Sequence, residues 1–307
     1  MPKFRSLSGT AKAVLQALAV TFLWSSSWVL IKLGLDTLPA LTFAGLRYTV
    51  AFALLLPLLL APRRKAELRS LTRRDWGLLV LLGLMYYTLT QGAQFVGLNY
   101  LPANTLSLLL TLSGISIALA GKFFLGEHLS ALQWGGVFVS IAGALIYFGN
   151  IAGLSKLGLL VGFVALLSNT GGAVLGRAVN RTAAISPLLV TIVSMGVGSL
   201  ILLATGLISE PFPSLDAGEV LLILWLAAVN TALAFTLWNL TLRTLSAAQS
   251  SMINNTMLIQ ISVLALIFLG EQLTWLQLAG LLVAAIGAAL AQVSPRRAPE
   301  STGAAPN

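Results

Sequence analysis

Ten apolar runs, each about 20 residues long, follow one another along the chain and are separated by short polar or Gly/Pro-containing connectors. A helix needs roughly 20 residues to cross a hydrocarbon core about 30 Å thick, so each run is predicted to be a transmembrane helix. The expected fold class is therefore an all-α integral membrane protein with ten spans. The predicted spans are 12–34, 40–61, 76–98, 102–125, 129–149, 156–178, 185–208, 217–240, 246–269 and 273–292.

Composition disfavours several classes of function. Of 307 residues, 57% are hydrophobic and 9% are charged, there is no cysteine, and His128 is the single histidine. A membrane-embedded enzyme would need clustered His, Asp, Glu or Cys, so we predict no catalytic residue, no metal site and no cofactor. An ion channel would require rings of charge or carbonyl-rich filter loops, which the sequence does not show.

The net charge of +9 follows the positive-inside pattern of membrane proteins. With the N-terminus inside, 15 of the 18 Lys and Arg residues fall on the cytoplasmic side, and Glu210, Asp216 and Glu219 share one outer loop. We expect both termini to be cytoplasmic, residues 293–307 to be a disordered tail, and the chain to be multi-pass in a bacterial-type inner membrane. Its partners are then the lipid bilayer and a small molecule, not nucleic acid. The largest basic group is Arg63, Arg64, Lys65, Arg69, Arg73 and Arg74.

An internal repeat appears when the sequence is shifted by 144 residues. Residues 124–127 (Phe-Leu-Gly-Glu) align with residues 268–271, and 11 of the 23 positions from 124 to 146 are identical to their partners. We interpret this as duplication into repeats 12–149 and 154–292. Five spans per repeat is an odd number, so the two halves must be inverted. Glu127 and Glu271 are then expected at opposite membrane faces, with structural or gating roles.

These features resemble the drug/metabolite transporter superfamily of EamA-type exporters. The resemblance covers residues 12–292 and rests on the paired Leu-Gly-Glu motifs with Gly-rich helices after them, on Pro102-Ala103-Asn104, on Arg47, and on a first span with Trp24 and Lys32. By overall similarity the chain looks like the YddG-like exporters of aromatic amino acids. The resemblance implies a ten-helix, 5+5 inverted fold and small-metabolite efflux, and it leaves the substrate open.

Polar and aromatic residues near the middle of the spans predict a central binding cavity, because such groups are costly against lipid. Ser107 and Thr111 share a helical face and map by the 144-residue shift onto Ser251 and Asn255. Hydrogen bonding between helices is the alternative explanation for the same residues. The candidate substrate-binding residues are Trp24, Ser27, Tyr86, Tyr87, Gln91, Gln94, Ser107, Thr111, Ser168, Asn169, Asn230, Trp238, Asn254 and Asn255.

Such a cavity would be aromatic, rich in amides and nearly uncharged, which suits a bulky, partly apolar molecule. We predict an alternating-access exporter of small organic metabolites, with aromatic or hydrophobic amino acids as the favoured substrates, acting as a monomer. A multidrug, lipid or nucleotide-sugar carrier of the same fold is the alternative.

Arg47 is the one cation expected deep within a span. It could hold a substrate carboxylate or lock helices through backbone carbonyls. Its repeat equivalent is Met195, so the charge is not repeated, and we favour the structural role. No Asp or Glu falls at the centre of a span, which leaves open whether export is driven by the substrate gradient or by proton antiport.

Overall fold

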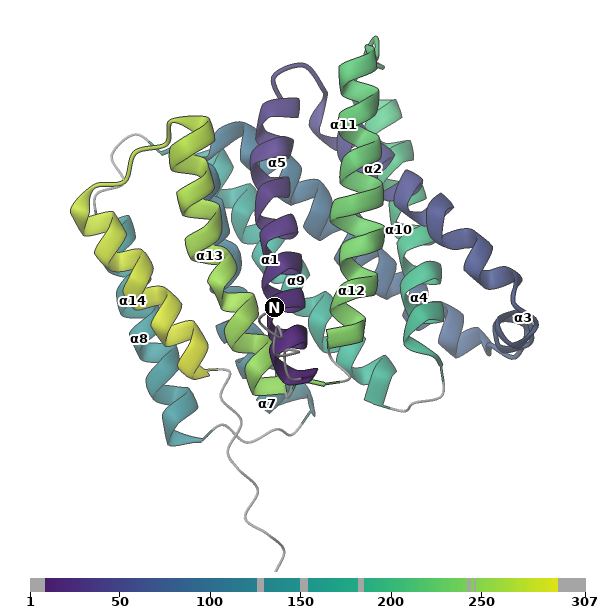
Figure 1. The fold of residues 1–307 in the computed structure, drawn as a ribbon, viewed down its shortest axis with the longest axis horizontal. Coiled ribbons are helices and arrows are strands. Elements are labelled where there is room, and N and C mark those ends of the chain that lie inside the picture. The colour runs from purple at the N-terminus through teal and green to yellow at the C-terminus, as the bar shows by residue number, and fades with distance from the viewer. Residues whose placement is uncertain are drawn as a thin grey trace, which may run out of the picture.

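The computed structural model describes residues 9–125, 130–149, 154–181, 185–241, 244–245 and 247–291. Every regular element in these ranges is helical, and the helices form one bundle (Figure 1). Glu127, His128 and the tail after residue 291 lie outside the described residues. In chain order the elements are α1 (Gly9–Gly34), α2 (Ala40–Leu55), η1 (Leu56–Leu60), α3 (Pro62–Arg69), α4 (Arg73–Gly83), η2 (Leu84–Gln91), α5 (Gly92–Tyr100), α6 (Ala103–Thr111), α7 (Ser113–Leu125), α8 (Ala131–Phe148), α9 (Lys156–Arg181), α10 (Pro187–Ser209), α11 (Ala217–Ala227), η3 (Ala228–Leu233), α12 (Ala234–Thr241), α13 (Ala247–Leu269) and α14 (Trp275–Ala291).

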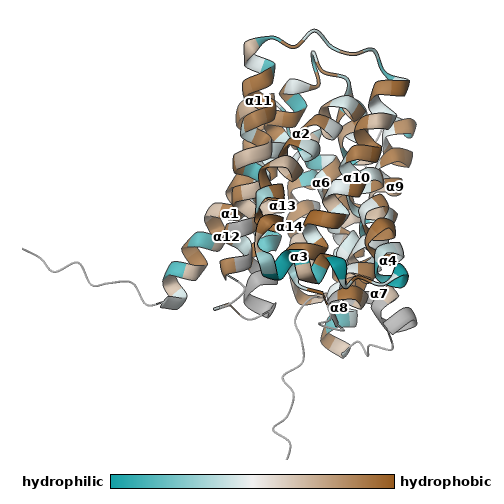
Figure 2. Ribbon diagram, turned by 90° about the vertical axis from the view of Figure 1, so that its right-hand side faces the viewer, coloured by the Kyte–Doolittle hydropathy of each residue, from teal (hydrophilic) through white to brown (hydrophobic). Residues whose placement is uncertain are grey.

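The helices have the length and surface of membrane spans. Among the described residues, six helical segments are long and apolar enough to cross a bilayer, and four shorter apolar helices accompany them. Large apolar side chains lie on the outside, such as Leu145 with 69% of its surface exposed and Ile208 with 87%. Hydrophobic residues colour most of the bundle, whereas hydrophilic ones gather at α3 and the start of α4 (Figure 2). The chain is a multi-pass membrane protein.

The helices α8 and α14 contain the aligned segments and pack against each other in antiparallel orientation. A Cβ atom added to Gly136 would lie 2.3 Å from the backbone N of Ala291, and one added to Gly143 would lie 2.2 Å from the backbone N of Ala284. Gly280 and Gly287, 144 positions further along the chain, face the backbone of α8 just as closely: an added Cβ would lie 2.5 Å from the backbone N of Tyr147 and 2.2 Å from that of Ser140, respectively. Glycine is therefore required at these positions so that the two backbones can touch.

A second antiparallel pair, α2 and α10, is joined in the same way. Gly45 faces the backbone of Leu203, and Gly206 faces the backbone of Thr42. At one end of this pair the carboxylate of Glu210 accepts hydrogen bonds from the backbone N–H groups of Leu41, at 2.9 Å, and Thr42, at 2.8 Å. These N–H groups open α2 and have no partner within the helix, so the carboxylate of α10's last turn caps its neighbour.

Among the described residues, four capping boxes begin helices, and they occur as two pairs whose members are 144 residues apart. Ser130 and Gln133 start α8, and Thr274 and Gln277 start α14; in each case the Gln side chain accepts from the capping residue's N–H, at 2.8 and 2.9 Å. Thr72 with Asp75 starts α4, and Asp216 with Glu219 starts α11, by the same exchange of bonds. The glutamine that recurs in the sequence is thus a helix-capping residue.

One predicted span is broken into two helices, and another continues as a 3₁₀ helix. The span predicted at 102–125 is broken at Leu112 into α6 and α7. The span containing Pro57 leaves α-helical geometry at Leu55 and continues as the 3₁₀ helix η1, because proline lacks the N–H that an α-helix needs there. The corresponding stretch of α13, 144 residues after the Leu112 break, is unbroken.

Candidate substrate pathway

Two segments of π-helix, η2 and η3, interrupt the spans that contain the candidate residues Tyr86, Tyr87 and Asn230. They begin at Leu84 and Ala228, which are 144 positions apart. Each is stabilised by a threonine hydroxyl that donates five residues back, Thr90 to the Met85 carbonyl at 2.7 Å and Thr231 to the Leu226 carbonyl at 2.8 Å. Such wide turns inside α-helices frequently mark functional sites. Hydrophobic periodicity gave no signal for them.

The η2 segment projects tyrosines toward α2 and α9. The Tyr87 ring meets the ring of Tyr48 edge-on, with centroids 5.7 Å apart, and Tyr48 donates its hydroxyl hydrogen to Gln91 Oε1 at 2.7 Å. Tyr86 lies against Gly172 of α9, where an added Cβ would fall 2.3 Å from the ring. Gly172 of α9 thus makes room for an aromatic ring of η2.

Arg47 of α2 contacts η3. Its side chain is 4% exposed, its Nε donates to the hydroxyl oxygen of Thr231 at 3.1 Å, and its guanidinium carbon lies 5.1 Å from the centroid of the Tyr48 ring. Arg47 therefore joins α2 to η3 through a side-chain hydroxyl, and its structural and substrate-binding roles both stay predictions. Asn230, next to Thr231, is fully buried and donates its amide to the Leu23 carbonyl and to Ser26 Oγ at 3.1 Å.

An aromatic cluster joins α1 to α12. The Trp24 ring lies 5.2 Å, centroid to centroid, from both Phe235 and Trp238. All three side chains are partly buried, so they retain some accessible surface. Trp24 and Trp238, candidate residues from the two halves of the sequence, are thus in contact. Phe235, which the sequence analysis did not select, is the third ring of the cluster.

Another candidate residue, Asn169, contacts the chain next to the break between α6 and α7. Asn169 of α9 donates its amide to the hydroxyl oxygen of Ser113 at 2.8 Å, immediately after the break. Ser107 and Thr111 donate instead to carbonyls of their own helix, Asn104 O and Ser107 O, each at 2.9 Å. The Asn169 amide of α9 thus lies at the junction of α6 and α7.

The remaining candidate residues are spread around the bundle. Ser27 is buried and donates to the Trp24 carbonyl, whereas Gln94 and Ser168 are buried on α5 and α9. Asn254 is exposed on α13 and Asn255 is partly buried. Polar bonds between α1 and α13 run through Gln260, which accepts from Ser25 at 3.0 Å and donates to Thr21 at 3.2 Å, as the helix-packing explanation predicts.

Two charged side chains form hydrogen bonds with backbone groups at the end of α5 and the start of α6. Glu271 accepts the backbone N–H groups of Ala103 at 2.6 Å and Asn104 at 3.2 Å. Lys32 donates to the carbonyls of Leu98 and Leu101, the latter at 3.0 Å, and so satisfies the end of α5. Lys32 therefore joins α1 to the end of α5.

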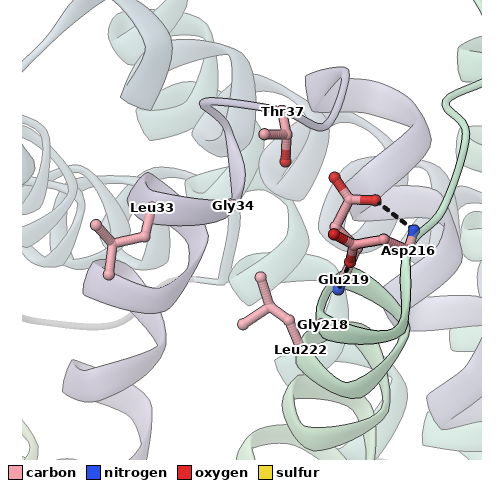
Figure 3. A pocket seen from close by; sticks show the side chains of 7 residues that line it. All are labelled: Leu33, Gly34, Thr37, Asp216, Gly218, Glu219 and Leu222. Carbon is pink, nitrogen blue, oxygen red and sulfur yellow. Dashed lines mark hydrogen bonds between the residues drawn. The ribbon is translucent and has the colours of Figure 1, made fainter.

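A surface pocket of about 250 Å³ opens at the start of α11, and its lining includes the capping box there (Figure 3). Asp216 and Glu219 exchange backbone hydrogen bonds at 2.9 and 2.8 Å, so their carboxylates are engaged in starting the helix. This pocket contains none of the candidate substrate residues. Its lining residues are Leu33, Gly34, Thr37, Asp216, Gly218, Glu219 and Leu222.

Comparison with known proteins identifies the family of this chain. The profile of the EamA-like transporter family matches residues 11–149 and again residues 156–292. This chain belongs to that family. Membership of the EamA-like family, within the drug/metabolite transporter superfamily, confirms the resemblance seen in the sequence.

Relatives of this EamA-like protein carry transporter names. The uncharacterized transporter YvbV of Bacillus subtilis (strain 168) is 30% identical over 292 residues, covering 91% of this chain and 90% of its own. A probable amino-acid metabolite efflux pump of Escherichia coli (strain K12) is 27% identical, covering 72% and 75%. An S-adenosylmethionine/S-adenosylhomocysteine transporter of Chlamydia muridarum (strain MoPn / Nigg) is 25% identical, covering 88% of each. These names point to membrane transport and not to an enzyme.

A protein of known crystal structure has the same fold. It superposes with a TM-score of 0.66 over 91% of this chain and 97% of its own, at 18% sequence identity. At that identity the likeness concerns the fold alone.

Proposed function

We propose that this EamA-like transporter is an alternating-access exporter of aromatic or hydrophobic amino acids, working as two inverted five-helix halves. The observation that carries the proposal is the pairing of η2 and η3, two π-helical segments 144 residues apart that bear Tyr86, Tyr87 and Asn230. Inverted repeats suit alternating access because the two halves can exchange near-equivalent packings around a midplane site. The antiparallel pairing of α8 with α14 through equivalent glycines supports the same arrangement.

The charges support an orientation with both termini in the cytoplasm of a bacterial-type cell. The basic helix α3 follows the C-terminal end of α2, while Glu210 caps the N-terminal end of α2. The basic and acidic groups therefore lie at opposite ends of this span, as the positive-inside rule requires. In this orientation the hydrogen bonds that Lys32 makes to α5 and that Glu271 makes to α6 lie at the outer face. Export requires these bonds to break so that the site can open to the outside.

The aromatic rings favour an amino acid with a ring or a large apolar side chain. Trp24, Phe235 and Trp238 form one cluster, and Tyr86 and Tyr87 another with centroids 5.9 Å apart. Offset or tilted packing against such rings stabilises an aromatic ligand. The relatives named as amino-acid metabolite efflux pumps fit this substrate class. Those named as S-adenosylmethionine/S-adenosylhomocysteine transporters favour a second candidate, the export or exchange of such amino-acid derivatives.

Counterflow in proteoliposomes tests the proposal. Vesicles are loaded with one candidate, and uptake of the labelled compound from outside is measured across amino acids, S-adenosylhomocysteine and model drug cations, with and without a pH gradient. We expect saturable exchange of aromatic amino acids. Exchange of drug cations alone would contradict the substrate class, and dependence on the pH gradient would establish proton antiport. Vesicles without protein provide the baseline.

A further inference from the structure

The guanidinium of Arg47 has bonding capacity that the protein does not use. Arginine carries five N–H donors, and here only Nε donates a hydrogen bond, to Thr231, within the part of the chain that the structure describes. No carboxylate of those residues forms an ion pair with it. At 4% exposure inside a membrane span, an unpaired cation is costly and needs an anionic partner. The contact with the Tyr48 ring compensates only part of that cost.

The residue beside Thr231 in η3, Asn230, has an unused hydrogen-bond acceptor that complements the unused donors of Arg47. The side-chain oxygen of Asn230 is buried and accepts no hydrogen bond among the described residues, although its amide nitrogen has two partners. Because one of those partners is the Leu23 carbonyl, which can only accept, the nitrogen must face it and the oxygen must be the unused atom. A buried acceptor of this kind needs a donor.

The two unused groups are connected through neighbouring residues. Arg47 is held by Thr231, which follows Asn230 directly in η3. On the other side, Tyr48 links the Arg47 region to Gln91 of η2. Arg47 therefore lies where α2 meets η3, and the unsatisfied acceptor belongs to the adjacent residue of the same η3 segment, whose amide contacts α1.

We propose that Arg47 binds the α-carboxylate of the transported molecule and that the Asn230 side-chain oxygen accepts a hydrogen bond from its α-ammonium group. The ligand class is an α-amino acid zwitterion, either a free amino acid or a larger molecule bearing that group. This inference rests on the proposed function and deepens it, because the aromatic clusters select the side chain while Arg47 and Asn230 select the common head group. A guanidinium matches a carboxylate through paired N–H donors.

Competition with head-group analogues tests the inference on the unmodified protein. Counterflow of labelled phenylalanine is challenged with phenylalanine, phenylalaninamide and N-acetylphenylalanine, and each compound's binding is also followed by thermal stabilisation of the purified transporter. We expect the amide and the N-acetyl compound to compete about tenfold less well or worse, as the loss of a charged hydrogen bond predicts. Equal competition by the amide would overturn the inference while leaving amino-acid export intact.

A second arm distinguishes the source of the head group. S-adenosylhomocysteine is compared with 5′-methylthioadenosine, which has the adenosine and thioether but no α-amino acid group. If S-adenosylhomocysteine exchanges and phenylalanine does not, a preference over 5′-methylthioadenosine still supports the inference and only the aromatic amino acid assignment fails. If 5′-methylthioadenosine exchanges as well, the inference is wrong. Failure of every compound to bind or exchange contradicts both the inference and the proposed substrate class.

Variants separate a binding role of Arg47 from a structural one. In Arg47→Gln we expect phenylalanine exchange to fall about tenfold or more while phenylalaninamide changes by less than about twofold, and Arg47→Lys should keep the preference for the carboxylate. A purely structural Arg47 would lower both substrates equally. Thr205→Ala on α10 is the control, because its exposed side chain bonds only the Ile201 carbonyl of its own helix.

Discussion

The backbone N–H of Ala103 donates to Oε1 of Glu271 at 2.6 Å across 168 residues of sequence. The first N–H groups of α6, those of Ala103 and Asn104 after Pro102, have no partner within the helix, and the carboxylate that follows α13 satisfies both. The Leu-Gly-Glu motif thus ends one helix and caps another. Gly270 contributes a positive φ of 65°, which lets the chain turn so that Glu271 reaches α6.

Replacing Glu271 with Gln should loosen this connection. The amide keeps one acceptor oxygen but loses the negative charge at the start of α6, so we expect the free energy of unfolding to fall by about 1–2 kcal/mol. Thermal unfolding in detergent measures it. Glu219→Gln is the matched control, because that side chain caps its own helix at an exposed site and should cost less. Equal losses in the two variants would argue against a special role for the motif.

The structure explains why some of these features were visible in the sequence. The recurring Gln133 and Gln277 cap helices locally, and the recurring glycines give close backbone contact, so each leaves a signature at its own position. Long apolar runs likewise determine membrane helices by length alone.

Other features depend on partners far away in the chain and left no such signature. The caps made by Glu210 and Glu271, and the tie from Lys32 to the end of α5, each require a neighbour that only the fold supplies. The π-helices change neither the hydrophobicity nor the approximate length of their spans, so the apolar runs do not reveal them. The candidate residues Trp24, Trp238, Tyr87 and Asn230 were predicted from polarity and depth, but their grouping was not.

Adjacent glycines in α8 offer a matched test of helix packing. Gly136 faces the backbone of α14, where a methyl group would collide, whereas an added Cβ on Gly135 meets nothing within 4 Å. We expect Gly136→Ala to reduce stability by about 1–3 kcal/mol, and Gly135→Ala to be neutral or stabilising by up to about 1 kcal/mol. Thermal unfolding of both variants in the same detergent compares them directly. A Gly136→Ala protein as stable as the Gly135→Ala protein would show that α8 and α14 are not in close contact.

Acid should weaken the hydrogen bonds that join Glu67 of α3 to Ser186, the N-cap residue of α10. Partial burial acts to raise the pKa of Glu67, but hydrogen bonds from the Ser186 N–H and hydroxyl, with the nearby Arg64, outweigh it and hold the pKa below its usual value. A carboxyl with a lowered pKa contributes stability above its unfolded pKa, which is about 4.3, and loses it as the pH falls through the lower folded value.

Glu67→Gln should therefore unfold at a lower temperature than the unmodified protein at pH 7, and the gap should close as the pH falls below about 4. Thermal unfolding measured from pH 7 to pH 3 gives this difference at each pH. A gap that stays constant across the range would mean that the charge of Glu67 contributes nothing and that only its shape matters.

Deleting one residue from η2 should restore a regular α-helix and impair transport. A π-helical turn holds one residue more than an α-helical turn, so removing Leu89, which is 41% exposed, leaves the flanking helices α4 and α5 in register.

Deleting Leu145 from α8 is the control. This residue is 69% exposed but lies in a regular α-helix, so its deletion should rotate all later positions of the helix and destabilise the protein. We expect the Leu89 deletion to insert and remain monodisperse by size-exclusion chromatography while counterflow falls about tenfold or more, because Tyr86, Tyr87 and Gln91 lose their relative directions. Normal counterflow after the Leu89 deletion would remove η2 from the transport mechanism.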